Sequence, residues 1–221
     1  MSDTVESAAS QHRAGFRYGA VLVLAVLVVM VAIVAPSGDL TRAAVIGLQS
    51  AALVVVLATS RARAEVRHAR GIWGAVAAAL FTLAIAVGVV PVEVVLAAAG
   101  IIGIAIPLAL VGGLLRLVRT HGATLQAVAG ALAIYLCLGL TFAWIIGFVA
   151  RVGSQPYFTS GVDGTESDRL YFSFTVLTTT GFGDLTAASP LGHALAVLEM
   201  LLGQLYLVTV LGILIGSFGR R

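Results

Sequence analysis

Residues 178–184 read TTTGFGD, and this stretch lies between two long apolar segments near the end of the chain. A helix-forming run, 168–177, precedes it, and a new apolar span begins at Pro190. Irregular backbone at membrane depth is tolerated only where it is buried in protein or lines a water-filled cavity. Gly181 and Gly183 are also compatible with a plain turn between helices. Their place between two spans favours a loop that lines a cavity.

The composition indicates an integral membrane protein, because 60% of the residues are hydrophobic, 10% are charged and long apolar runs recur. We expect an all-α protein with six transmembrane helices. The expected spans are 15–35, 42–58, 72–90, 93–115, 125–150 and 190–217. This divides the chain into a polar tail, 1–14, a four-helix domain, 15–120, and a C-terminal domain, 121–221.

The basic residues predict the orientation of the spans. All 13 are arginines, and ten of them fall in segments that alternation places on one side of the membrane. The positive-inside rule then makes both termini cytoplasmic and puts residues 178–184 near the outer face. The outer loop carries Asp163, Glu166, Asp168 and Asp184, so an acidic mouth should attract cations. The lipid bilayer accounts for the charge pattern, and nothing in the sequence supports binding of nucleic acid.

The order of span, short helix, Thr-Thr-Gly-Phe-Gly and span resembles the pore domain of potassium channels, whose filter typically reads Thr-Val-Gly-Tyr-Gly-Asp. The resemblance covers roughly 125–221. It implies a re-entrant pore helix, 168–178, and a selectivity filter between the fifth and sixth spans. Because one chain supplies one filter strand, it also implies a homotetramer around the pore. Potassium would be the transported ion, with no cofactor and no enzymatic activity.

The resemblance also assigns roles to individual residues. Backbone carbonyls would replace the hydration shell of K⁺, and residues with φ > 0, which glycine reaches cheaply, would turn successive carbonyls toward one axis. The filter would be Thr179, Thr180, Gly181, Phe182 and Gly183, with K⁺ held by the first four and by the Thr179 hydroxyl.

Further positions would support the filter or form the gate. The expected filter supports are Asp184, Thr175, Thr178, Tyr171, Phe172 and Glu199, with Phe174 as a third aromatic. Gly203 would be a gating hinge or a small residue at a close helix contact. The residues expected to line the cavity are Gln204, Leu207, Leu211 and Ile215.

Two departures from the family pattern bear on selectivity. Phe182 stands where tyrosine is usual, so a hydroxyl contact behind the filter is lost, and Thr180 replaces an apolar residue. A weakly selective cation channel is therefore an alternative to a potassium-selective one. A non-conducting regulatory subunit of another channel is a second alternative, but it would have no need of two correctly spaced glycines.

The first four spans lack the pattern of a voltage sensor. The fourth span, 93–115, contains no arginine or lysine, and the first three contain no acidic residue. A voltage sensor needs basic residues that move through the membrane field. We therefore expect conduction that does not depend steeply on voltage. The arginine-only, alanine-rich composition suggests a prokaryote with a GC-rich genome, and hence a location in the plasma membrane.

Glu199 is the only ionisable side chain deep within a predicted span. A charge at mid-helix costs about 2.5–3.5 kcal/mol on insertion scales, so this side chain should have a partner. We expect it to face the back of the pore helix, with the hydroxyls of Thr175 and Thr178 as partners. Its protonation would then alter the filter. The alternative is a static structural hydrogen bond.

Overall fold

The computed structural model describes residues 2–59, 79, 82–122 and 124–218. In this part of the chain the regular structure is helical, apart from one isolated antiparallel bridge between Phe158 and Ala187. The helices are α1 (Ser2–Val34), α2 (Asp39–Thr59), α4 (Val92–His121), α5 (Leu125–Val152), α6 (Glu166–Leu177) and α7 (Pro190–Phe218). The expectation of an all-helical protein is confirmed for the described residues.

Three of the described helices are long and apolar enough to cross a membrane: Val92–Arg119, Leu125–Val152 and Pro190–Val210. A shorter apolar helix covers Tyr18–Val34. Nearly half of the predicted third span, 72–90, lies outside the described residues, so the count of six spans remains a prediction. The arginines at 61, 63, 67 and 70 also lie outside them.

Two predicted boundaries differ from the structure. Helix α1 begins at Ser2, so the segment predicted as a polar tail continues the first helix. Helix α4 runs on to His121, well past the apolar run that ends at residue 115. Apolar length predicts how much of a helix lies in lipid, but the backbone hydrogen bonds continue into polar sequence.

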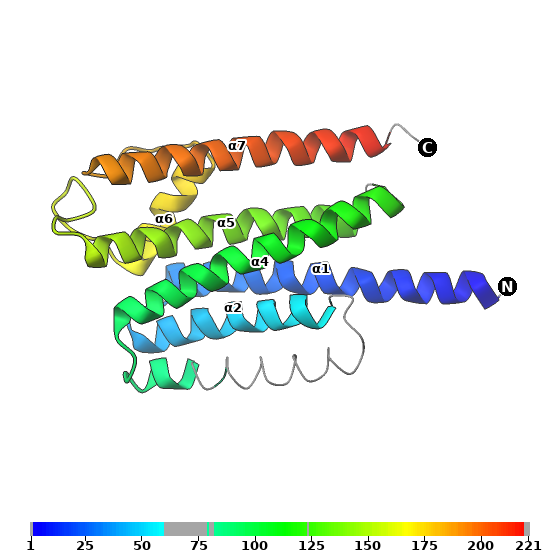
Figure 1. The fold of residues 1–221 in the computed structure, drawn as a ribbon, viewed down its shortest axis with the longest axis horizontal. Coiled ribbons are helices and arrows are strands. Elements are labelled where there is room, and N and C mark those ends of the chain that lie inside the picture. The colour runs from blue at the N-terminus through cyan, green and yellow to red at the C-terminus, as the bar shows by residue number, and fades with distance from the viewer. Residues whose placement is uncertain (1, 60–78, 80–81, 123, 219–221) are drawn as a thin grey trace.

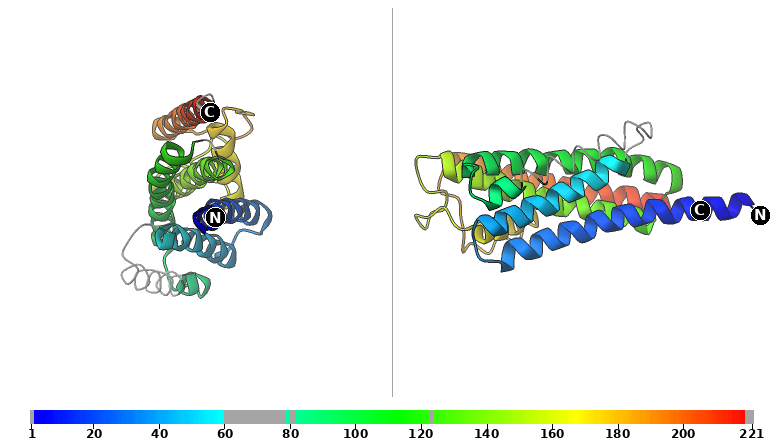
Figure 2. Two further views of the ribbon diagram at one scale, coloured as in Figure 1. Left: turned by 90° about the vertical axis from the view of Figure 1, so that its right-hand side faces the viewer. Right: turned by 90° about the horizontal axis from the view of Figure 1, so that it is seen from below.

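Helix α5 is the central element of the bundle. It packs against α1, α4, α6 and α7, while α2 lies beside α1 and α4 (Figures 1 and 2). Buried side chains of α1, α2, α4, α5 and α6 meet in one cluster around Val28, Ile46, Ala99 and Trp144. Helix α7 is least covered, since 11% of its most apolar window is buried, against 56% for α5.

Helix α6 begins at one end of the molecule, and the chain after it returns to the same end (Figure 1). The end of α5, the start of α6 and the start of α7 lie at this end, opposite the start of α1 and the end of α7 (Figure 1). The returning chain is tied to the α5–α6 loop, where Thr159 N donates to Thr186 O at 2.9 Å and Ala188 N to Tyr157 O at 2.8 Å. The loop is therefore anchored where it leaves and where it returns.

Helix α6 begins at Glu166, two residues before the predicted start at 168. The reason is a capping box at its first turn. The Thr165 hydroxyl accepts from Asp168 N at 3.1 Å, and the Asp168 carboxylate accepts from Thr165 N at 2.8 Å. Asp168 is thus the third residue of the helix, where its charge favours the positive end of the helix dipole.

Candidate functional site

The loop that follows α6 has an unusual backbone. Gly181 and Gly183 have φ of +51° and +82°, which confirms the prediction that both glycines adopt the left-handed region. Thr179 also has a positive φ, +56°, and it is the one described residue other than glycine that does so. A β-branched residue in this region is uncommon and strained. Three alternate residues therefore share a conformation that turns the chain away from an ordinary extended strand.

The start of the loop is fastened to the last turn of α6. Thr180 N and Gly181 N both donate to Thr175 O, at 2.9 and 3.1 Å, and Thr179 N donates to Val176 O at 2.9 Å. In contrast, within the described chain none of the carbonyls of residues 178–184 accepts a hydrogen bond. A backbone carbonyl without a protein partner needs water or another ligand. The amides of the loop thus bind the protein, and its carbonyls remain available.

The threonine hydroxyls at the inner end of the loop are held by neighbouring groups. The Thr178 and Thr180 hydroxyls lie 2.9 Å apart, and Thr178 Oγ1 donates to Phe174 O at 2.7 Å. Gln204 Nε2, from α7, donates to Thr179 Oγ1 at 2.9 Å. A hydroxyl oxygen has two lone pairs, so this bond leaves one lone pair of Thr179 free.

Tyr171 connects α6 to the outer half of the loop. Its ring stacks on Phe182 with the ring centroids 6.3 Å apart and the planes within 4°. Its hydroxyl lies close enough to the Asp184 carboxylate for that group to raise the pKa of Tyr171. Tyr171 and Asp184, both predicted as filter supports, are therefore in contact with each other and with the loop. Phe182 itself remains 70% exposed.

The other two aromatic residues predicted to brace the filter pack against other parts of the chain. Phe172 is buried against Tyr157 and Phe158, with ring centroids 6.1 and 5.3 Å away. Phe174 lies against Gly139 of α5, where an added Cβ would come within 2.8 Å of its ring. Successive helical residues point about 100° apart, so consecutive aromatics cannot all face one side. In the single chain Phe172 is a core residue and Phe174 is partly buried against the core, and their role as filter supports stays a prediction.

Glu199 faces the back of α6, but its partner is Ser173 and not Thr175 or Thr178. Glu199 is fully buried, and its Oε1 lies 2.5 Å from Ser173 Oγ. The predicted partners bond within their own helix, where Thr175 Oγ1 donates to Phe172 O at 2.8 Å. Because this local bond uses the hydroxyl hydrogen of Thr175, the hydroxyl does not donate to Glu199.

Ser173 is within hydrogen-bond distance of two groups at once. Its Oγ is 2.7 Å from Gly139 O as well as 2.5 Å from Glu199 Oε1. A serine hydroxyl carries one hydrogen, and the carbonyl carries none, so both contacts are hydrogen bonds only if the Glu199 carboxyl is protonated. The second carboxyl oxygen, Oε2, has no hydrogen-bond partner among the described residues. The geometry therefore fits a neutral Glu199.

Gly203 lies where α7 approaches α6 most closely. A Cβ at this position would come within 2.4 Å of Leu177 O, so only glycine fits without movement. The same carbonyl accepts a hydrogen bond from Tyr135 of α5 at 3.2 Å. The structure thus supports the role of Gly203 as a close-contact residue. Helix α7 is continuous through this position, and the hinge remains a prediction.

The four predicted cavity residues are only partly described. Gln204 is exposed and bonded to Thr179, and Leu207 is half-buried. The side chains of Leu211 and Ile215 lie outside the described residues. Their assignment to one cavity stays a prediction.

Reading the sequence alone missed Ser173 and Tyr135. Ser173 is fully buried in a helix of mixed polarity, and a serine flanked by Phe172 and Phe174 carries no distinguishing signal. Tyr135 lies within an apolar span, where an aromatic residue carries no distinguishing signal either. Both roles depend on which faces of three helices meet. No group of three or more potential metal ligands among His, Cys, Asp and Glu occurs in the described part of the chain.

Long apolar helices flank a short helix and a glycine-containing loop whose carbonyls accept no hydrogen bond within the described chain. Residues 131–219 match the family model described as "Ion channel". The matched range begins within α5 and includes α6, the loop and α7. No curated protein and no solved structure gave a significant match to the chain. The match supports an ion channel in a membrane, and therefore a role in transport instead of catalysis.

Proposed function

We propose that four copies of this chain form a potassium-selective channel in which residues 178–184 are the selectivity filter. The observation that carries this proposal is the loop backbone, with positive φ at Thr179, Gly181 and Gly183 and carbonyls that lack protein partners. K⁺ must exchange water oxygens for protein oxygens to enter a narrow pore. The carbonyls of Thr179, Thr180, Gly181 and Phe182 would supply them, and the free lone pair of Thr179 Oγ1 would add a ligand at the inner end.

The exposed surface of the single chain supports assembly. All residues from Thr178 to Asp184 are exposed, although irregular backbone at membrane depth has to be covered or line water. Helix α7 presents an unpartnered apolar stripe, since Leu198, Leu201, Leu205 and Val208 are 48–70% exposed at helical spacing. In a fourfold ring the four loops would surround a shared axis. The apolar stripe of α7 would then be covered by neighbouring copies or by lipid.

The proposal includes six membrane spans with cytoplasmic termini, in a plasma membrane. Asp163, Glu166 and Asp168 lie in or just before the first turn of α6, and this turn is at the end of the molecule opposite the start of α1 and the end of α7 (Figure 1). An acidic outer mouth raises the local concentration of cations. The absence of arginine and lysine from residues 93–115 favours conduction that is independent of voltage.

Reversal potentials of purified protein in asymmetric KCl and NaCl bilayers test the proposal. A potassium-selective channel gives a reversal potential close to the K⁺ equilibrium potential. A weakly selective channel gives one close to zero, which is the alternative that Thr180 and Phe182 raise. A regulatory subunit gives no current by itself. Native mass spectrometry in detergent supplies the second measurement, with a tetramer expected.

A further inference from the structure

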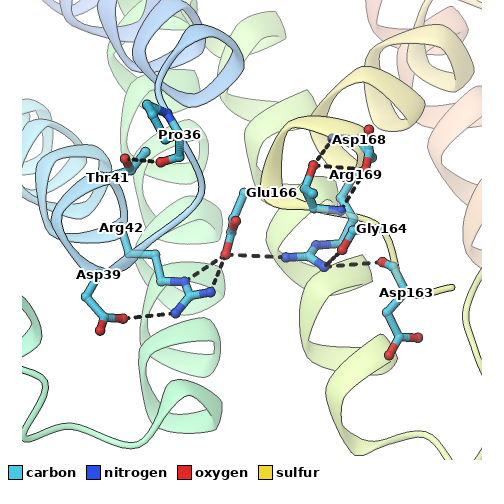
Figure 3. Close-up of polar contacts among 10 residues, drawn as sticks. Pro36, Asp39, Thr41, Arg42, Asp163, Gly164, Glu166, Asp168 and Arg169 are labelled. Atoms are coloured by element: carbon cyan, nitrogen blue, oxygen red, sulfur yellow. Dashed lines mark hydrogen bonds and ion pairs between the residues drawn. The ribbon is translucent and has the colours of Figure 1, made fainter.

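The first turn of α6 is held by helices from the other half of the chain. Glu166 Oε1 accepts two hydrogen-bonding contacts from Arg42 of α2, at 2.7 Å from Nε and 2.6 Å from Nη2 (Figure 3). Ser167 Oγ donates to Ile33 O at the end of α1, at 3.2 Å. Glu166 and Arg42 are separated by 124 positions in the sequence. The first two helices thus contact the helix that carries the filter loop.

The contact belongs to a chain of alternating charges. Asp39 Oδ1 lies 3.0 Å from Arg42, and Arg169 Nη2 lies 3.7 Å from Glu166 on the other side. Arg169 also donates to Gly164 O at 2.7 Å, which fixes its guanidinium beside the start of α6 (Figure 3). The order Asp39, Arg42, Glu166, Arg169 is neutral overall. Each inner charge therefore has an opposite charge on both sides.

Partial burial makes the inner charges depend on one another. The side chains of Arg42, Glu166 and Arg169 are 24%, 14% and 11% exposed. Burial by itself would raise the pKa of Glu166, but the hydrogen bond and charge of Arg42 outweigh it and lower that pKa. Breaking a buried pair by removing one partner leaves the other charge uncompensated. The ion pair therefore strongly favours one position of α6 relative to α2, because any other position separates the two charges.

Helix α6 is a short rigid connector between this contact and the filter loop. Twelve residues span about 18 Å, and its last turn binds the amides of Thr180 and Gly181 through Thr175 O. A tilt at Glu166 is therefore transmitted to the backbone that presents the loop carbonyls.

We propose that Arg42 and Glu166 form a positioning pair through which the first helices set the geometry of the selectivity filter. The inference rests on the proposed function, because it assigns a regulator to the same filter. Under it the first helices do more than surround the pore: their position relative to α6 determines how well the filter binds K⁺.

The test measures the K⁺ concentration that half-stabilises the reconstituted tetramer against heat, together with the K⁺/Na⁺ permeability ratio. A ligand that binds the native state raises its melting temperature in a concentration-dependent way. We expect Arg42→Gln and Glu166→Gln each to raise the half-stabilising concentration about three- to tenfold, which lies in the lower part of the range of coupling within one network. A purely structural contact would lower the melting temperature equally at every K⁺ concentration and leave the midpoint unchanged.

Further variants keep the test valid if a single substitution fails to fold. The double variant Arg42→Gln/Glu166→Gln removes both charges, so its shift should be smaller than the sum of the single shifts. Exchanging the two charges is unsuitable, because Asp39 and Arg169 would then face like charges. Arg42→Lys keeps the charge but loses the two-donor contact, and should give an intermediate shift.

The matched control is the ion pair between Arg151 of α5 and Glu93 of α4, at 2.8 Å. It has the same chemistry but is 57% and 42% exposed, and neither residue lies on α6. Arg151→Gln and Glu93→Gln should leave the midpoint unchanged. If the Arg42 and Glu166 variants also leave the midpoint and permeability ratio unchanged while wild type responds to K⁺, the positioning role is wrong. If wild type shows neither K⁺ current nor K⁺ stabilisation, the channel function itself fails.

Discussion

Thr179 is strained where its neighbours in the loop are not. Glycine reaches a positive φ at little cost, whereas a β-branched residue does so only when its surroundings impose it. Two hydrogen bonds hold Thr179 in this conformation. Its amide donates to Val176 O, and its hydroxyl accepts from Gln204 Nε2, at 2.9 Å in each case. In the loop, Gly181 and Gly183 thus reach a positive φ because they are glycines, whereas Thr179 is held there by its hydrogen bonds.

At Gly181 we predict that Gly181→Ala leaves the tetramer intact and abolishes potassium-selective current. A side chain opposes the left-handed backbone by about 1–2 kcal/mol per subunit, repeated in each copy. Gly161→Ala is the matched control, since Gly161 also has a positive φ, +80°, and open space around it, but lies outside the filter loop. Reversal potentials and native mass spectrometry check both variants. Unchanged selectivity in Gly181→Ala would refute the filter assignment.

At Glu199 we predict that Glu199→Gln gives a folded tetramer whose current no longer responds to alkaline pH in the way wild type does. A neutral carboxyl donates to Ser173, an ionised one cannot, and glutamine keeps a donor at every pH. Tyr135 and Tyr157 are the other titratable groups that interact with Glu199, so Tyr135→Phe and Tyr157→Phe are measured beside it. Currents of wild type and Glu199→Gln that are identical from acidic to alkaline pH would leave only a static structural hydrogen bond.

The three helices around the filter meet through pairs of residues one turn apart. On α5 the pair is Tyr135 and Gly139, on α6 it is Ser173 and Leu177, and on α7 it is Glu199 and Gly203. Residues at i and i+4 share one face of a helix. Each helix thus contributes two positions, one turn apart, to the junction. At one level the contacts are hydrogen bonds of Ser173, and at the other they are contacts with the backbone carbonyl of Leu177.

At this junction we predict that Gly203→Ala forces α7 away from the end of α6. The new Cβ would meet the Leu177 carbonyl, which belongs to the backbone and cannot rotate away, and overpacking of this kind costs about 1–3 kcal/mol. Gly212→Ala, in the same helix with nothing within 4 Å, is the control. Thermal unfolding of the tetramer should show a lower melting temperature for Gly203→Ala alone. Equal melting temperatures would mean that the contact is loose.

The contact between α2 and α6 gives a prediction about acid. The pKa of Glu166 is lowered in the folded protein, so its contribution to stability is complete above the ordinary glutamate pKa of about 4.3 and is lost as the pH falls through the lowered value. Melting temperatures of wild type and Glu166→Gln, measured between about pH 3 and 7, should therefore converge at the acidic end. A difference that stays constant over the whole range would show that Glu166 is not ionised in the contact.

On the scale of the whole molecule, the chain separates into a bundle with a well-packed centre and a face that is left open. Helix α5 is covered by its neighbours, while α7 and the loop are exposed to whatever surrounds the single chain. Exposed apolar surface of this extent marks contact with protein or lipid. The position of the charged residues also decides the response to voltage, because only charges that move across the membrane do work in its field.

For the intact channel we predict that open probability changes little with voltage. Moving one charge through the field is worth about 2.3 kcal/mol per 100 mV, and residues 93–115 of α4 contain no arginine or lysine to move. Single-channel recordings over a wide range of potentials check this. Steep activation within a few tens of millivolts, accompanied by a gating current, would contradict it.

The sequence by itself determined the helical class and the backbone conformation of Gly181 and Gly183. Apolar length and period are local properties, so the helices of the pore half were predicted within a few residues. A glycine with φ > 0 is likewise a local choice, and both predicted positions have it. The positive φ of Thr179 was not predicted, because contacts and not residue type impose it.

The tertiary structure alone decided which side chains meet. The sequence indicated Thr175 and Thr178 as partners for Glu199, whereas the rotation of α6 in the bundle places Ser173 against it. Phe172 was buried in the core by the same rotation. The pairing of Arg42 with Glu166 joins residues 124 positions apart, which no local pattern encodes. The physical reason is that helix period fixes which residues share a face, whereas packing against other helices fixes where that face points.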